Sequence, residues 1–292
     1  MFSDTHFHYE QITRGRGVSG ESILKDLVAR DTFFAQDIGT HCDDLSSRIE
    51  ALEEDISALR AEDGEKARSM LYLSAGIWPA PEAIVERNAQ VASLESEIAR
   101  FQKGDGLGKK IISLGECGLD RHWNKDGADG RDSADFTPEM LEGERELFQM
   151  QLLLAKKLSL PVIVHSRDAA EETLDCIKNI GYDFGIIHCF SYGINEARAF
   201  LDRGWYISFS GSVTYTKKSR LEEMRSLLNF VPLDRILLET DAPYLAPSSL
   251  RGSVNNPVNV ALTYQYVADM RLMSAQDLSQ IVDRNIKALY RL

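Results

Sequence analysis

Short apolar runs alternate along the chain with longer segments of helical periodicity. The apolar runs predict eight strands, at residues 2–8, 32–38, 71–77, 111–116, 161–165, 185–188, 206–209 and 236–239. The longer segments predict helices at residues 21–29, 43–68, 81–102, 138–158, 169–179, 195–203 and 220–230. Residues 259–292 predict two further helices with a break near Met273 and Ser274.

Eight strands that each precede a helical segment indicate a (β/α)8 barrel, the TIM-barrel class of α/β fold. Runs such as Pro161-Val162-Ile163-Val164 suit parallel strands that are buried on both faces. We expect a single domain over residues 1–292, with extended loops at 123–135 and 243–258. Because active sites of this fold lie at the C-terminal ends of the strands, chemistry should gather where each strand stops.

Four of the six histidines fall at predicted strand ends. His6 and His8 end the first strand, where residues two apart share a face and can reach one ion. Alone this pair is weak evidence, because the pattern is short and imidazole is also an ordinary buried polar group. The fourth, fifth, sixth and eighth strands also end in histidine or acidic residues, which are possible metal ligands. The full set of predicted ligands is His6, His8, Glu116, His165, His188 and Asp241.

This mixture of imidazole and carboxylate suits zinc, manganese or a similar divalent ion. Glu116 is the candidate bridge, because a carboxylate has two oxygens with which to hold two ions. The expected sets are His6, His8 and Asp241 on one ion and His165 and His188 on the other. Two ions roughly 3.5 to 4 Å apart can activate a bridging water and stabilise a leaving group. Asp241 is the candidate general base for that water.

Composition and charge narrow the class of protein. A chain of 292 residues that is 43% hydrophobic can bury one large core. No apolar run reaches the roughly 18 residues of a membrane span, and the start of the chain lacks a secretory signal pattern, so we expect a cytoplasmic protein that binds no membrane. Four widely spaced cysteines argue against a disulfide framework. The net charge of -12 opposes a broad grip on nucleic acid but leaves room for a local phosphate site at bound cations.

Seven segments resemble the signature blocks of the TatD family of metal-dependent hydrolases and occur in family order. They are DTHFH (4–8), GECGLD (115–120), VIVHSRDA (162–169), HCFS (188–191), FSGSVTY (209–215), LETDAPYL (238–245) and RGSVNNP (251–257). The resemblance implies a TIM-barrel hydrolase of the amidohydrolase superfamily, with two divalent metals and the deoxyribonuclease activity of several members. The family's metal positions match all six predicted ligands.

Three positions depart from the family pattern. Trp78 stands where the family commonly has the histidine of Gly-x-His-Pro. Its indole is suited to stacking on a base, which is worth about 1–3 kcal/mol in single-strand binders, or to packing as a barrel-mouth aromatic. Tyr192 replaces a frequent glycine, and Asn256 replaces a frequent glutamate. These changes keep the ligand set and leave the substrate preference open.

Other polar residues are candidates for contacts around the centre. Arg167 and Arg251 are candidate phosphate contacts, because guanidinium offers planar paired donors; the alternative role for each is a solvated surface charge. His122 lies in a loop after the fourth strand and is a candidate substrate contact. Asp4 shares a face with His6 and is expected either to orient a ligand from behind or to fill a polar layer of the barrel. His41, after the second strand, is expected to be incidental.

These observations together predict a metal-dependent hydrolase that cleaves phosphodiester bonds of DNA, with a water activated between two divalent ions (Zn, Mn or Mg). One alternative keeps the metals but acts on a small ester, amide, lactone or phosphoester, since the same side chains serve both reactions. The other is a barrel that binds metal or nucleic acid without catalysis. We expect a monomer with no obligate protein partner.

Overall fold

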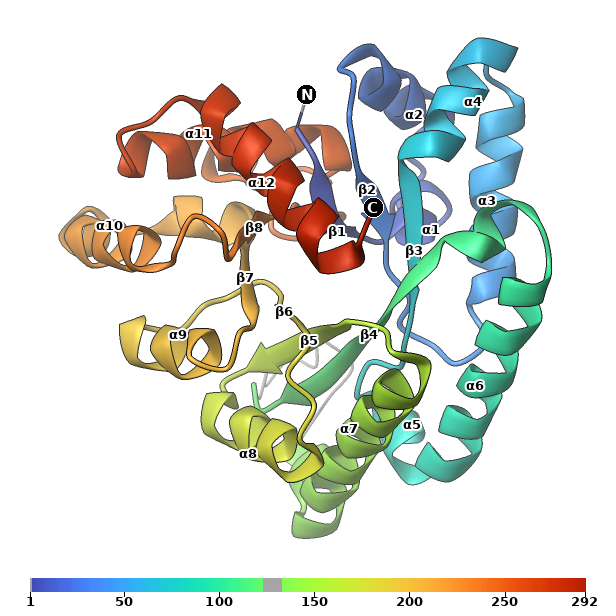
Figure 1. The fold of residues 1–292 in the computed structure, drawn as a ribbon, viewed down its shortest axis with the longest axis vertical. Helices are drawn as coiled ribbons and strands as arrows, with labels where there is room; N and C mark the ends of the chain where they lie inside the picture. Colours follow the sequence, from blue (N-terminus) through green and yellow to red (C-terminus); the bar gives the residue numbers. More distant parts are fainter. Residues whose placement is uncertain (1, 123–132) are drawn as a thin grey trace.

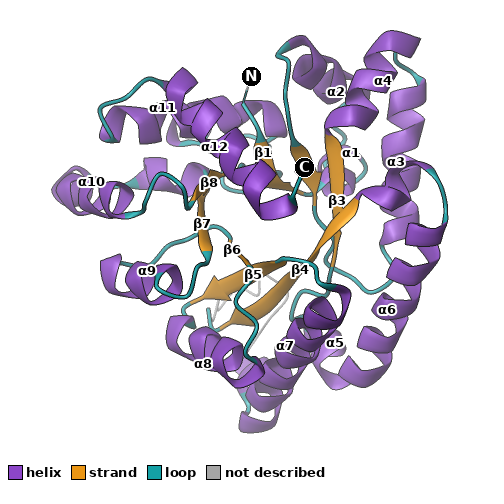
Figure 2. Cartoon of the chain, viewed as in Figure 1, coloured by secondary structure: helices purple, strands orange, loops and turns teal. Residues whose placement is uncertain are grey.

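Eight parallel strands lie side by side in chain order at the centre of the molecule (Figures 1 and 2). The structure is a computed structural model that describes residues 2–122 and 133–292. The strands are β1 (Asp4–Phe7), β2 (Ala35–Asp37), β3 (Leu71–Ala75), β4 (Ile111–Asp120), β5 (Val162–Arg167), β6 (Gly185–Ile187), β7 (Tyr206–Phe209) and β8 (Ile236–Leu238). The predicted barrel of eight strands is therefore confirmed. Most of the predicted loop at 123–135 lies outside the described residues.

The sheet curves round so that the segment after β8 meets β1. The backbone N–H of Asp241 donates to the carbonyl of His6 at 2.9 Å, and the N–H of His8 donates to the carbonyl of Ala242 at 2.8 Å. A parallel bridge also joins Phe7 to Ala242. The bonds that close the barrel thus lie among three of the predicted metal ligands and fix their backbones relative to one another.

Helices surround the strands, as Figure 2 shows. They are α1 (Tyr9–Thr13), α2 (Gly20–Ala29), α3 (Leu45–Ser57), α4 (Ala61–Met70), α5 (Pro81–Val85), α6 (Arg87–Lys103), α7 (Pro138–Leu158), α8 (Ala170–Ile180), α9 (Ile194–Leu201), α10 (Leu221–Phe230), α11 (Val260–Met270) and α12 (Ala275–Tyr290). Local sequence sets many of their ends. At α7, for example, the Thr137 side chain accepts a hydrogen bond from the N–H of Met140, and Pro138 occupies the first turn.

The prediction of one long helix at 43–68 is wrong. The segment forms α3 and α4, which are separated by an irregular turn at residues 58–60. Leu59 is buried there at 8% exposure, and Arg60 takes an extended conformation. Leu59 belongs to the hydrophobic core, so the helix is interrupted at a point where an apolar side chain is buried. The predicted helix at 81–102 is likewise divided, at Glu86, into α5 and α6.

Strand β4 runs four residues beyond the predicted end at Glu116 and pairs with β5 as far as Asp120 and Arg167. Gly118 permits this close pairing. Its φ is +154°, and a Cβ atom at this position would lie 1.8 Å from the carbonyl oxygen of His165. The extension carries Asp120 to the mouth of the barrel beside β5.

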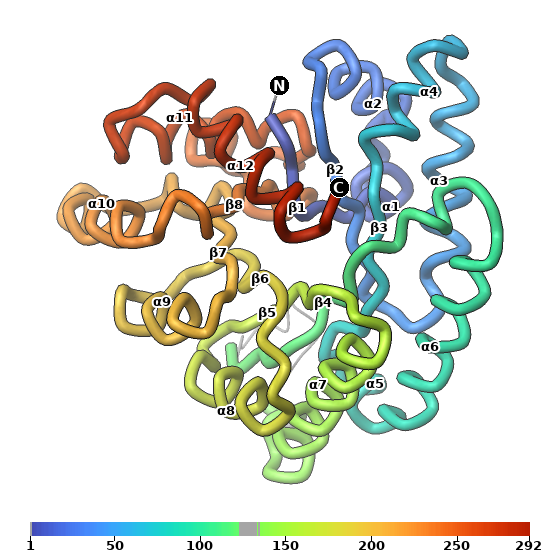
Figure 3. The backbone as a smooth tube through the Cα atoms, viewed as in Figure 1, coloured from blue at the N-terminus to red at the C-terminus, as the bar shows by residue number. Residues whose placement is uncertain are grey.

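Ser3, which precedes β1, contacts the last two helices, α11 and α12, which Figure 3 draws in red. The Ser3 hydroxyl donates to the Asp283 carboxylate on α12 at 2.6 Å, and the Tyr264 hydroxyl on α11 donates to the Ser3 carbonyl at 3.0 Å. Within residues 2–122 and 133–292, none of the helices has the length and apolar character needed to cross a bilayer.

Candidate metal centre

The predicted ligands come together at the C-terminal ends of the strands, with Glu116 in the middle. Its Oε1 lies 2.8 Å from Nδ1 of His165 and 3.0 Å from Nε2 of His188. Its Oε2 lies 3.4 Å from Nε2 of His6 and 3.7 Å from Nε2 of His8. The two carboxylate oxygens therefore face two different pairs of histidines.

Asp241 lies on the β1 side of this cluster. Its Oδ1 is 3.7 Å from Nε2 of His6 and 3.6 Å from Nε2 of His8, and its side chain is 14% exposed. Three groups of possible ligand atoms result, with all atoms of each group within 4.8 Å of one another. They are His6, His8 and Glu116; Glu116, His165 and His188; and His6, His188 and Asp241.

Two of the histidines are held from behind by buried carboxylates. Nδ1 of His188 lies 3.3 Å from Oε1 of Glu239, and Nε2 of His165 lies 3.0 Å from Oδ2 of Asp120. A carboxylate in this position fixes the orientation of an imidazole and increases the basicity of its other nitrogen. The other ring nitrogens, Nδ1 of His165 and Nε2 of His188, therefore face Glu116.

The histidines of β1 are held differently. Nδ1 of His8 lies 3.3 Å from the carbonyl oxygen of Ile38, which leaves Nε2 to face the cluster. Both ring nitrogens of His6 are buried, and neither has a hydrogen-bond partner among the described residues. The His6 ring also stacks on that of His188, with centroids 4.1 Å apart. A buried polar atom without a partner is costly, so an additional group that binds His6 would stabilise this arrangement.

The charges of the cluster depend on one another. Burial alone would raise the pKa of Glu116, but His188, His165 and His6 outweigh it and hold that pKa well below its ordinary value. For His165 burial acts in the opposite direction, yet Asp120 and Glu116 raise its pKa to about 9. The buried carboxylates thus require neighbouring positive charge, which protons on the imidazoles or bound cations can supply.

Arg48 of α3 anchors the backbone beneath the centre. It is 3% exposed, and it donates to the Asp37 carboxylate at 2.9 Å and to the Asp37 carbonyl at 2.8 Å. The segment that follows contacts two ligand residues. Its Ile38 carbonyl faces His8, and its Gly39 carbonyl accepts the N–H of Glu116 at 2.8 Å. Strand β2 carries no predicted ligand, but its C-terminal end fixes ligands from two other strands.

Comparison with known proteins identifies the family. The sequence profile of a family described as TatD related DNase matches residues 3–291. The chain belongs to this family. It is 33% identical over 186 residues to the "Uncharacterized metal-dependent hydrolase YabD" of Bacillus subtilis, a match that covers 63% of this chain and 67% of that protein. It is also 33% identical over 211 residues to the "3'-5' ssDNA/RNA exonuclease TatD" of a Rahnella species, covering 70% and 72% of the two chains.

Solved structures of the family share the fold. The crystal structure of YJJV, a TatD homologue from Escherichia coli, matches with a TM-score of 0.77 and 25% identity over 100% of this chain and 98% of that one. A TatD family hydrolase from Entamoeba histolytica matches with a TM-score of 0.76 and 17% identity, over 99% and 98% of the two chains. The second likeness shows the fold alone.

The side chains of the centre fit the divalent metal implied by the TatD family. The buried nitrogens of His6, which make no hydrogen bond within the described residues, and the two oxygens of Glu116 provide donor atoms that lie close together. Imidazole and carboxylate are the donors that zinc and manganese accept in proteins. The carboxylates behind His165 and His188 are also the usual partners of metal-binding histidines.

The predicted substrate contacts lie at different places around the mouth. Trp78 is half-buried, with its ring edge-on to His165 at a centroid distance of 6.0 Å. Arg167 lies 3.8 Å from the Asp120 carboxylate, so it also faces the β4–β5 side of the centre. Nδ1 of His122 lies 2.9 Å from the Asp168 carboxylate. Trp78 and Arg167 therefore border the β5 side of the centre, whereas His122 contacts Asp168, which follows β5.

Arg251 and Asp4 lie elsewhere. The Arg251 guanidinium is exposed and covers the Tyr215 ring at 5.0 Å. Asp4 is buried and accepts hydrogen bonds from the N–H and hydroxyl of Thr240 at 2.9 and 2.6 Å, and from the N–H of His6 at 3.2 Å. Asp4 therefore contacts the backbone next to Asp241 and the backbone of His6, and not a ligand ring.

Sequence reasoning gave no role to Glu239, Asp120 and Arg48. Glu239 lies in the LETD segment, where its position two residues before Asp241 is the signal that could have drawn attention to it. In the structure its carboxylate accepts the N–H of Cys189 at 2.7 Å and the Ser208 hydroxyl at 2.5 Å, in addition to facing His188. The role of Arg48 depends on contacts between distant segments, and no local pattern indicates it.

Proposed function

We propose that this TatD family member is a metal-dependent hydrolase that cleaves phosphodiester bonds of nucleic acid, with DNA as the first substrate to test. The observation that carries the proposal is the shared position of Glu116, whose two oxygens face two pairs of histidines. We infer two divalent ions, of zinc, manganese or magnesium. His6, His8 and Asp241 would hold one, His165 and His188 the other, and Glu116 both.

When bound, such a pair of ions lowers the pKa of a water and neutralises charge on a phosphoryl oxygen and its leaving group. We infer that Asp241 acts as the general base in addition to binding metal. Its carboxylate is 14% exposed, and we infer that it takes the proton of the attacking water. Glu116 is buried and ionised, which suits a bridging ligand more than a proton acceptor.

Two kinds of observation support a nucleic-acid substrate. One relative carries the name of a single-stranded DNA and RNA exonuclease. Trp78 and Arg167 border the centre. Trp78 offers a surface on which a base can stack, and Arg167 offers hydrogen-bond donors to a phosphate. Because the chain has a net charge of -12, we infer that substrate is held by local contacts at the mouth and not by a broad basic surface.

The test is a substrate panel with protein that has been stripped and then reloaded with magnesium, manganese or zinc. We expect cleavage of single-stranded DNA, and a loss of about 10³-fold or more in Glu116→Ala and Asp241→Asn. These variants also control for contaminating nuclease. Intact single- and double-stranded DNA after incubation with folded, metal-bound protein would refute the proposal. Hydrolysis of a small ester, lactone or phosphoester in the same panel would then redirect it to a small-molecule substrate.

A further inference from the structure

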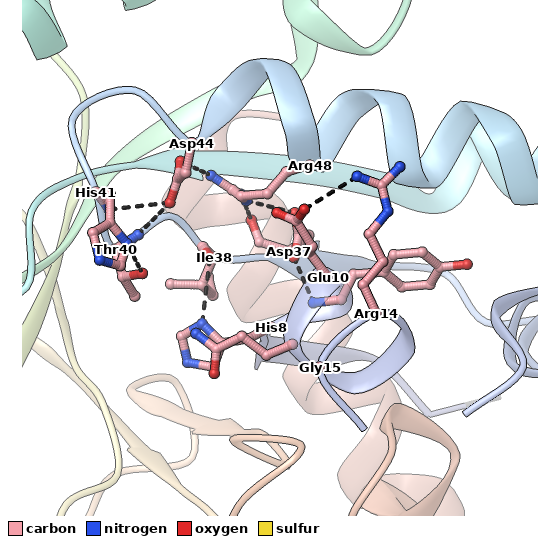
Figure 4. A pocket seen from close by; sticks show the side chains of 12 residues that line it. His8, Glu10, Arg14, Gly15, Asp37, Ile38, Thr40, His41, Asp44 and Arg48 are labelled. Carbon is pink, nitrogen blue, oxygen red and sulfur yellow. Dashed lines mark hydrogen bonds and ion pairs between the residues drawn. The ribbon is translucent and has the colours of Figure 1, made fainter. Parts of the chain in front are cut away.

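Two buried charged side chains reach from the outer helices to the ends of barrel strands. One is Arg48 of α3, which forms part of a pocket wall and donates to the carboxylates of Asp37 and Asp44 (Figure 4). The other is Glu144 of α7, which is 0% exposed and has no part in the proposed hydrolysis. A buried carboxylate is costly unless it is paired and hydrogen-bonded, so the partners of Glu144 indicate what it does.

Glu144 binds two consecutive residues at the end of β4. Its Oε1 accepts the backbone N–H of Asp120 at 2.7 Å, and its Oε2 pairs with the Arg121 guanidinium. The same guanidinium pairs with the Glu172 carboxylate of α8 at 2.6 Å. Arg121 therefore contacts carboxylates from two helices, and the end of β4 is bound to both α7 and α8.

The carboxylate of Glu144 lies where β4 continues beyond its neighbour β3. Successive N–H groups of a strand point to opposite sides. The N–H of Arg121 donates to the Arg167 carbonyl of β5 at 2.8 Å, so the N–H of Asp120 points away from β5. The strand on that other side, β3, ends at Ala75 and is paired with the first half of β4. Glu144 thus supplies an acceptor at a point that β3 does not reach.

The position of Asp120 matters because its side chain holds a predicted ligand. Its Oδ2 lies 3.0 Å from Nε2 of His165, and its Oδ1 accepts the N–H of His122 at 2.8 Å. Nδ1 of the same His165 ring lies 2.8 Å from Oε1 of Glu116. Hydrogen bonds weaken steeply when they are misaligned, so a shift of the β4 end would loosen the orientation of the His165 ring.

We propose that Glu144 is a positioning residue for the metal centre. It holds the end of β4 so that Asp120 keeps His165 directed at Glu116, and it affects metal binding through Asp120 alone. Arg121 steadies the same end from α8. This role rests on the metal centre of the proposed function, and it gives α7 a part in a site whose predicted ligands lie at the strand ends.

The direct test measures metal affinity on the β5–β6 side by competition with a chromophoric chelator. Glu144→Met retains the length of the side chain but removes both acceptor oxygens, and we expect it to weaken binding there by about fivefold to tenfold. Glu146→Met is the matched control, because it removes a carboxylate of the same helix that pairs with Arg87 and is 47% exposed. The control should bind metal as the wild type does. Equal affinity in the two variants, with folding verified by circular dichroism, would overturn the proposal.

A double-mutant cycle shows whether Glu144 acts through Asp120. Asp120→Ala removes the contact with His165, so Glu144→Met should add less than about a twofold loss of affinity in that background. A merely structural role, or the loss of one negative charge, would lower the affinity by the same factor in both backgrounds and would contradict the proposal. If Glu144→Met does not fold, Glu144→Gln takes its place in the cycle. Glu144→Gln retains an acceptor for the Asp120 N–H and loses the ion pair with Arg121, so about a threefold loss is expected.

The cycle separates this role from the proposed nuclease activity. Wild-type protein that binds metal and follows the expected cycle but leaves DNA intact would refute only the nuclease proposal. Cleavage of DNA together with equal factors in the two backgrounds would refute only the role of Glu144. Wild-type protein that binds no ion would refute both.

Discussion

The two halves of the histidine cluster are held in different ways. His165 and His188 each have a carboxylate behind the ring, at 3.0 and 3.3 Å. His8 has only the Ile38 carbonyl at 3.3 Å, and His6 has no hydrogen-bond partner in the described ranges. A carboxylate both orients an imidazole and makes it a stronger donor, whereas a carbonyl mainly orients it. For the two ions that we propose, the comparison predicts tighter binding on the β5–β6 side and weaker, more exchangeable binding on the β1 side.

Removal of the weaker site should have the largest effect. In His6→Ala/His8→Ala we expect one ion to be lost and the other retained, with hydrolysis reduced by about 10³-fold or more because both ions are needed at the reacting centre. Metal analysis by mass spectrometry, with circular dichroism to verify folding, measures this outcome. Full metal content and an unchanged rate in the double variant would rule out the assignment of these residues.

Loss of a carboxylate behind the ring should weaken the tighter site. Glu239→Gln and Asp120→Asn are each expected to lower metal affinity on the β5–β6 side by about 10- to 100-fold. Competition with a chromophoric chelator gives the two affinities separately. If both variants weaken the β1-side ion instead, the proposed difference between the halves is wrong.

Replacement of Arg48 should lower the stability of the fold strongly and should disturb His8 on the β1 side to a smaller extent. Breaking its buried ion pairs in Arg48→Met is expected to lower the free energy of unfolding by about 3–5 kcal/mol. Because the released segment carries the Ile38 carbonyl, the tautomer of His8 should also become mixed, which long-range ¹H–¹⁵N spectra report. Arg68→Met removes an exposed ion pair with Glu53 and is the matched control, with a loss of about 0–1 kcal/mol. An undisturbed His8 tautomer in Arg48→Met would separate this arginine from the metal centre.

A smaller effect should appear in the pH dependence of the metal-free protein. Burial lowers the pKa of His165, but Asp120 and Glu116 outweigh it and raise this pKa to about 9. A histidine whose pKa is raised on folding stabilises the protein. This stabilisation is complete below the unfolded pKa of about 6.5 and is lost as the pH rises through the folded pKa. We therefore expect the stability of the metal-free protein to fall as the pH rises from 6.5 to 9. Metal affinity should rise over the same interval. Asp120→Asn should shift both changes to lower pH, and chemical denaturation at a series of pH values tests this.

Much of this centre could be predicted because it follows the rule of the fold. Each predicted ligand stands where an apolar run ends, so the barrel alone brings His6, Glu116 and Asp241 together. The residues behind them could not be predicted in the same way. Asp120 reaches His165 only because β4 continues four residues past Glu116, which depends on pairing with β5 that no periodicity reveals.

The errors in the predicted helices have a similar origin. The break between α3 and α4 occurs where Leu59 turns into the core, and a helical pattern of charges continues across it.

The most direct measurement is a titration of metal into protein from which a chelator has removed all metal. Bound metal and cleavage of single-stranded DNA are followed together. Two groups of histidines that share Glu116 should bind two ions per chain, the first on the β5–β6 side, with hydrolysis appearing only as the second ion binds. Full hydrolysis with one ion bound, or a protein that binds less than one ion and remains folded, would contradict a centre built on Glu116 as a bridge.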